Sequence, residues 1–95
     1  MLYAIHALDK PLSADLRRAH GAAHGAFLAD AENHGVRIVF SGPMVGDDGV
    51  QPVGSLIVVE AADRQTAERF HRADPLHAAG AYDRSTITGF IRKRG

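Results

Sequence analysis

The chain has 95 residues, of which 45% are hydrophobic and 23% charged, with eleven basic residues balanced by eleven acidic ones. This length and composition predict one folded domain over residues 1–95, and zero net charge gives no field to steer it toward nucleic acid or an anionic membrane. The absence of cysteine excludes a disulfide framework and a thiol nucleophile. No apolar run reaches the roughly 18 residues of a membrane helix, and residues 1–8 lack the basic start of a signal peptide, so we expect a cytoplasmic protein.

The first half of the chain predicts a strand, a long helix and a second strand. Residues 2–8 form a short apolar run typical of a strand, and residues 14–34 predict a helix with Ser13 as N-cap and Gly35 after its end. Residues 36–41 predict the second strand. On a period of 3.6 residues, the inner face of the helix is expected to carry Leu16, Ala19 or His20, Ala23, Phe27 and Ala31.

Turn-forming residues separate the second strand from the third. Gly42-Pro43 is expected to end the second strand, and Asp48-Gly49 is a strong turn signal in the loop that follows. Residues 53–61 predict the third strand. We expect Gly42 and Gly54 to be required by the backbone, because glycine adopts dihedral angles that a Cβ forbids.

The remaining residues complete a βαββαβ order. Asp63 is a predicted N-cap for a helix over residues 64–73, Asp74-Pro75 predicts the start of a short helix over 76–79, and residues 84–91 predict the last strand. This order predicts an α+β, ferredoxin-like sandwich: a four-stranded antiparallel sheet with both helices on one face and the first and third strands in its centre. His71 and His77 are expected on helix surfaces.

The third strand also predicts a partner. Leu56-Ile57-Val58-Val59 is apolar on both sides of the strand, although helices cover only one face of the predicted sheet. A second copy of the chain would cover the other face, and two sheets packed face to face make a dimeric α/β barrel. The alternative is an apolar face that lines a ligand site or stays exposed to solvent.

Small polar and turn-forming signatures lie where the predicted elements meet, and folds commonly present chemistry at such places. In chain order they are Tyr3-Ala4-Ile5, Asp9, His24 with Phe27-Leu28, Gly35, Ser41-Gly42-Pro43, Gly54-Ser55, Asp74-Pro75 and Gly80. Their order and spacing, over essentially the whole chain, resemble the YciI-like (YCII-related) family of small dimeric α/β-barrel proteins. One reaction known in that family is elimination of chloride from a chlorinated hydroxyquinone-type aromatic.

The resemblance implies a pocket centred on a histidine and an aspartate, which correspond to His24 and Asp9 in this chain. A carboxylate that accepts from one ring nitrogen fixes the tautomer and raises the basicity of the other nitrogen, so such a pair suits general acid/base catalysis. Asp74 is the second choice of partner for His24.

A substitution within the family pattern affects the expected ligand. Many members carry an arginine three residues before the histidine, where this chain has Gly21. An anionic ligand would then have to be held by Arg17 or Arg18, or the ligand carries less charge.

Each candidate residue also has a structural explanation. His24 can be a helix residue packed on the sheet edge, and Asp9 can cap the helix after Pro11. Asp74 can serve as a cap alone or also line the pocket. Ser41 and Ser55 can offer hydroxyls to a ligand or be ordinary strand residues.

We expect neither a metal nor a cofactor. His20 and His24 are four residues apart and therefore neighbours on a helix, but the acids that would complete a metal site, Asp47 and Asp48, are explained by their turn. RNA binding by the same fold needs aromatic side chains on the central strands, and residues 54–61 have none.

The sequence therefore predicts a small homodimer that acts as a lyase or isomerase on a small aromatic or enol-type molecule through His24 and Asp9. The alternative is a non-catalytic ligand-binding or accessory homodimer, in which His24 would be buried and bonded to the backbone. The residue content does not distinguish either from a cofactor-free monooxygenase with the same barrel.

Overall fold

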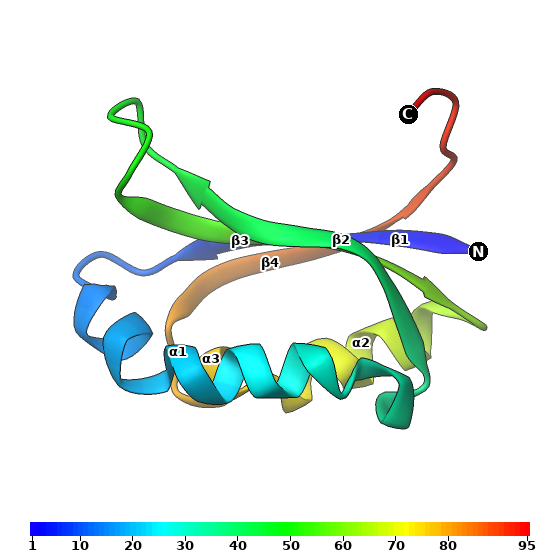
Figure 1. The fold of residues 1–95 in the computed structure, drawn as a ribbon, viewed down its shortest axis with the longest axis horizontal. Coiled ribbons are helices and arrows are strands. Elements are labelled where there is room, and N and C mark those ends of the chain that lie inside the picture. Colours follow the sequence, from blue (N-terminus) through cyan, green and yellow to red (C-terminus); the bar gives the residue numbers. More distant parts are fainter.

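The computed structural model describes residues 1–95 and has the predicted α+β, ferredoxin-like architecture, with the helices on one face of a four-stranded antiparallel sheet (Figure 1). The strands are β1 (Leu2–Asp9), β2 (Val36–Val45), β3 (Pro52–Ala61) and β4 (Tyr82–Phe90). The helices are α1 (Ala14–Ala29), the 3₁₀ helix η1 (Ala31–His34), α2 (Arg64–Ala73) and α3 (Pro75–Ala78). The strand order β2-β3-β1-β4 puts β1 and β3 in the centre, as predicted.

The hydrophobic core lies between the sheet and the helices. Ile5 of β1, Ile57 of β3 and Ile87 of β4 are paired across the sheet and point toward the helical layer. Phe70 of α2 packs against them, and Phe27 of α1 stacks on Phe70 with 4.9 Å between ring centroids. Because side chains alternate along a strand, neighbouring odd-numbered positions of β1, β3 and β4 also face the helices.

No helix in the structure is long and apolar enough to cross a membrane.

The helix predicted over residues 14–34 is two helices in the structure. It ends as an α-helix at Ala29, and η1 then leads to Gly35, which has the left-handed φ of 81° expected of a residue that ends a helix. Ala23 is exposed, so the predicted inner face is wrong there, and of the alternatives Ala19 and His20 the half-buried residue is His20. The inner face carries the apolar Leu16 and Phe27 beside the polar Arg17 and His24, and α1 has no fully buried side chain.

Strand β2 is longer than predicted. It continues through Gly42-Pro43 to Val45, and it lies at the edge of the sheet. Proline lacks an N–H but is tolerated on an edge strand, so the expected stop at Gly42-Pro43 is wrong. The register with β3 shifts between Ile38 and Phe40, which is the irregularity of a bulge.

The second face of the sheet carries an apolar patch. Leu2, Phe40, Val58 and Phe90 lie on it, around a hollow of about 230 Å³ that the C-terminal residues also line. In Figure 1 the C-terminal segment is on the side of the sheet opposite the helices. Within one chain 51% of Phe40 and 41% of Phe90 stay exposed.

The two glycines expected to be backbone requirements differ. A Cβ at Gly54 would collide with the carbonyl oxygen of Ala7 on the neighbouring strand and lie 2.6 Å from Cε of Met44. A Cβ at Gly42 meets no atom within 4 Å, and its φ is not left-handed. The close approach of β3 to β1 therefore requires glycine at position 54, and the expectation for Gly42 is wrong.

We expect Gly54→Ala to lower the free energy of unfolding by about 2 kcal/mol, because the added methyl group must push two central strands apart. Gly42→Ala is the matched control and should change it by less than about 0.5 kcal/mol. Urea unfolding measures both. Equal effects of the two substitutions would show that backbone contact is not the reason for Gly54.

His71, expected on a helix surface, is buried against β4. It is 3% exposed, its Nε2 lies 2.8 Å from Oγ of Ser85, and its ring stacks on Tyr82 with 5.5 Å between centroids. Its Nδ1 is buried without a partner in the protein. Burial, followed by the proximity of His77, lowers the pKa of His71 from 6.5 to about 4. The expectation of a surface position is therefore wrong for His71.

This burial predicts a loss of stability in mild acid. The depressed pKa means that the unfolded chain binds a proton at His71 between pH 6.5 and about 4 while the folded chain does not. Stability is therefore full above pH 6.5 and falls as the pH drops toward 4, by up to about 3 kcal/mol. Urea unfolding at several pH values should show this slope for wild type and His20→Gln, and a much weaker slope for His71→Gln. A full slope in His71→Gln would exclude His71 as its source.

Candidate functional site

A cavity of about 290 Å³ opens between α1 and the β2–β3 half of the sheet. Its polar lining consists of Arg17 and His24 from α1, Ser41 from β2 and Ser55 from β3. Pro43 and Pro52 add rigid apolar walls. The fold thus brings three of the predicted site residues, His24, Ser41 and Ser55, to one cavity.

His24 is held by Asp74, the residue that precedes α3. Nδ1 of His24 lies 2.7 Å from Oδ1 of Asp74, and the same oxygen accepts the backbone N–H of Leu76 at 3.0 Å. The side chain of Asp74 is 1% exposed and that of His24 is 17% exposed. An ionised carboxylate only accepts, so Nδ1 of His24 is the donor and its Nε2 carries the free lone pair when the ring is neutral. Asp74 both caps α3, as predicted, and sets the tautomer of His24.

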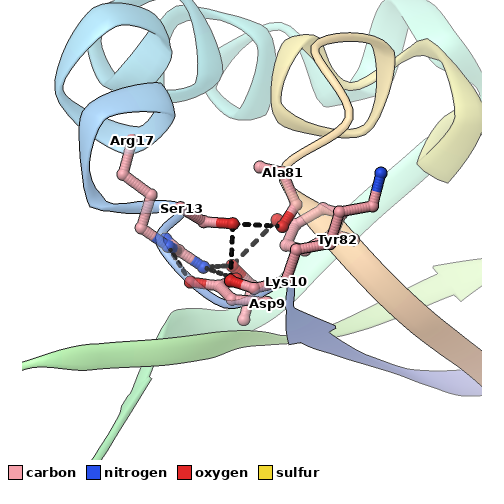
Figure 2. A network of polar contacts seen from close by, with 7 residues as sticks. Asp9, Lys10, Ser13, Arg17, Ala81 and Tyr82 are labelled. Carbon is pink, nitrogen blue, oxygen red and sulfur yellow. Dashed lines mark hydrogen bonds and ion pairs between the residues drawn. The ribbon is translucent and has the colours of Figure 1, made fainter.

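Asp9, the first choice of partner for His24, binds Arg17 instead (Figure 2). Nε of Arg17 lies 2.6 Å from Oδ2 of Asp9 and Nη2 lies 2.8 Å from Oδ1, a bidentate pair whose side chains are 15% and 8% exposed. Hydrogen bonding to the Asp9 carboxylate raises the pKa of Arg17 above its ordinary value. The predicted Asp9–His24 contact is wrong because His24 lies about 15 Å along α1 from its start, whereas Asp9 ends β1 beside that start.

Tyr82 is a site residue that sequence reasoning missed. Its Oη donates to Oγ of Ser55 at 2.9 Å, and Nη2 of Arg17 donates to the same Oγ at 3.0 Å. Burial raises the pKa of Tyr82 to about 12, so the phenol stays protonated. The predicted last strand began at Arg84, two residues too late to include it. The sequence signal that could have identified Tyr82 is an aromatic residue with a polar tip just after the turn at Gly80.

Ser13 fastens the loop between β1 and α1 to the start of β4. Its Oγ lies 2.7 Å from the carbonyl oxygen of Lys10 and 2.9 Å from that of Ala81, so its one proton is shared between these two acceptors (Figure 2). The predicted side-chain cap on α1 is not formed. The hydroxyl instead keeps Asp9 and Tyr82 side by side beneath the first turn of α1.

The other candidates lie outside this network. Ser41 lines the cavity but is exposed, and Arg18 pairs with Asp15 on the solvent side of α1. His20 and His24 are not joined by a third side chain, since no group of three or more His, Asp or Glu residues is close enough to hold a metal ion.

The arrangement offers two chemical functions around one cavity. Nε2 of His24 is available to accept or return a proton, and Arg17 with Ser55 presents hydrogen-bond donors to an oxygen atom. This combination suits removal of a proton next to an oxygen on which negative charge grows.

Comparison with known proteins agrees with this fold. The model of the YCII-related domain matches residues 1–91. Protein YciI of Escherichia coli O6:H1 and Protein YciI of Shigella flexneri are each 34% identical over 95 residues, covering 95% of this chain and 96% of the relative. The structure of 5-chloro-2-hydroxyhydroquinone dehydrochlorinase (TftG) from Burkholderia phenoliruptrix AC1100, in complex with 2,5-dihydroxybenzoquinone, superposes with a TM-score of 0.86. It is 28% identical and the match covers 98% of this chain and 96% of that one. On its sequence and its fold, the chain belongs to the YCII-related domain family.

Proposed function

We propose that this protein is an enzyme that eliminates a small group from, or isomerises, a small hydroxyquinone-like or enol-type molecule, with His24 as general acid and base. One observation carries the proposal: Nδ1 of His24 is fixed by a buried carboxylate while the ring lines a cavity. The similarity to a dehydrochlorinase whose structure contains 2,5-dihydroxybenzoquinone supports the choice of substrate class.

The proton transfer would run through Nε2 of His24. In an elimination, Nε2 accepts a proton from the substrate, the electron pair left behind forms a new π bond, and the leaving group departs with the electrons of its own bond. The Asp74 carboxylate stabilises the imidazolium that forms, without itself taking the proton. Arg17 and Ser55 stabilise negative charge on a substrate oxygen during this step. An isomerisation uses the same residues, with the proton returned to another atom.

A non-catalytic ligand-binding module, the alternative function, is less well supported. It was expected to bury His24 and bond the ring to the backbone. In the structure the ring is bonded to a carboxylate and faces the cavity.

The cysteine-free composition agrees with the expected cytoplasmic location, which stays a prediction.

We expect His24→Ala to abolish turnover and to leave the fold within about 1 kcal/mol of wild type, because active-site residues are often not optimal for stability. Turnover should fall at least about 100-fold, the usual contribution of a general base. The assay is chloride release from 5-chloro-2-hydroxyhydroquinone, beside a thermal-shift screen of hydroxyquinones and enols. His20→Ala, one turn earlier on α1, is the matched control and should retain activity.

The role of Asp74 has a separate readout. ¹⁵N spectra of the neutral His24 ring should show the proton on Nδ1 in wild type and in Asp9→Asn, and a shift toward the Nε2–H tautomer in Asp74→Asn. The dyad is refuted if His24→Ala turns over substrate at the wild-type rate, or if Asp9→Asn changes the tautomer and Asp74→Asn does not.

We also propose that the protein is a homodimer through the apolar face of the sheet. Light scattering should give about twice the 10.2 kDa mass of the chain. Phe40→Glu places a charge on the half-exposed apolar face and should produce monomers, whereas Ala22→Glu, on the exposed surface of α1, should not. A wild-type monomer at micromolar concentration would rule out the dimer.

A further inference from the structure

The hydroxyl of Ser55 is surrounded by donors. Ser55 is 3% exposed, and its Oγ accepts from Oη of Tyr82 at 2.9 Å and from Nη2 of Arg17 at 3.0 Å. A serine hydroxyl has two lone pairs and one proton. The two accepted bonds use both lone pairs, so the Ser55 proton is left to donate.

The direction of the Tyr82–Ser55 bond follows from the partners that each hydroxyl has. Tyr82 stays protonated, with its pKa raised to about 12, and its Oη has Ser55 Oγ as its one acceptor in the structure. Reversing the bond would leave the buried phenol proton without an acceptor, which is costly in free energy. Arg17 has no acceptor atom at all. Neither neighbour can therefore receive the Ser55 proton.

The nearby carboxylate of Asp9 does not receive it either. Arg17 occupies both oxygens of Asp9, and no hydrogen bond joins Ser55 to that side chain. Ser55 lines the cavity that also contains Arg17 and His24. We propose that Oγ of Ser55 donates its proton to an oxygen of the ligand, and that this bond fixes the substrate oxygen on β3 opposite His24. The inference rests on the proposed function and defines how its substrate is held.

This assignment defines the class of ligand. Asp9 neutralises Arg17, so the donors around the ligand oxygen carry little net charge. Such a site favours a carbonyl or enolate oxygen over a phosphate or sulfate, whose multiple charges need unpaired cations. The cavity of about 290 Å³ lies at the small end of ligand sites and suits a single substituted ring. The site therefore fits a small ring with a carbonyl or enolate oxygen, as hydroxyquinones and cyclic enolones have.

The probe for this bond is 2,5-dihydroxybenzoquinone, titrated calorimetrically. We expect Ser55→Ala to raise the Kd of this compound roughly 10- to 100-fold, the range for loss of a hydrogen bond to a charged or partly charged oxygen. Tyr82→Phe keeps the Ser55 proton but removes the hydrogen bond that orients the Ser55 hydroxyl. It should raise the Kd about 3-fold. Ser85→Ala is the matched control, because the Ser85 hydroxyl bonds His71 away from the cavity and its loss should leave Kd unchanged.

The outcomes separate this inference from the proposed function. Wild-type affinity in Ser55→Ala overturns the inference and leaves the role of His24 intact, whereas a wild type that neither binds nor turns over the ring compounds overturns the proposed function. Neutron diffraction tests the hydrogen positions without any ligand. The deuterium on Tyr82 Oη should point at Ser55 Oγ and that on Ser55 into the cavity; a Ser55 deuterium directed at Tyr82 overturns the inference.

Discussion

The candidate site depends on one buried carboxylate that makes two bonds with one oxygen. Oδ1 of Asp74 accepts the N–H of Leu76 in the first turn of α3 and also accepts a hydrogen bond from Nδ1 of His24 on α1. The bond within α3 fixes the position of the carboxylate, and the second bond transfers that position to the imidazole. Oδ2 of Asp74 is buried without a protein partner. A buried acceptor left unpaired lowers the stability of a fold by about 1 to 3 kcal/mol. Asp74 therefore orients His24 at some cost in stability.

A second carboxylate completes the site by controlling charge. Asp9 accepts from Nε and Nη2 of Arg17, so the guanidinium is held in one orientation and its charge is largely compensated. Each aspartate has its own hydrogen-bonded partner, so the proton-transfer group and the oxygen-binding group rest on different carboxylates. His24 can gain a proton without competing for the carboxylate that holds Arg17. With Arg17 neutralised by Asp9 and His24 held by Asp74, the site suits acid/base chemistry on a weakly charged molecule better than binding of a strong anion.

The order of elements and most residues of the candidate site were predictable from the sequence, but Tyr82 and the pairing of the aspartates were not. Strand patterns, the Asp63 cap and the turn before Pro75 are local signals, which is why βαββαβ and both α2 boundaries were predicted correctly. Which aspartate meets His24 depends on the rise of α1 and on where α3 packs, and these are properties of the assembled fold. Tyr82 was missed because a strand start is set by pairing with Asp9 across the sheet rather than by local composition.

The prediction that the second strand ends at Gly42-Pro43 was wrong for a related reason. A proline ends a strand only when its missing N–H removes a ladder bond, and β2 lies at the sheet edge, where that loss is avoidable. The consequence for the site is direct, because the continued strand carries Ser41 and Pro43 along the cavity wall. Ser41 pairs with Ile57 and Pro43 with Ser55, both of which point toward the helices. Phe40 and Val58 point to the opposite face, so the same two strands line the cavity on one side and the proposed dimer surface on the other.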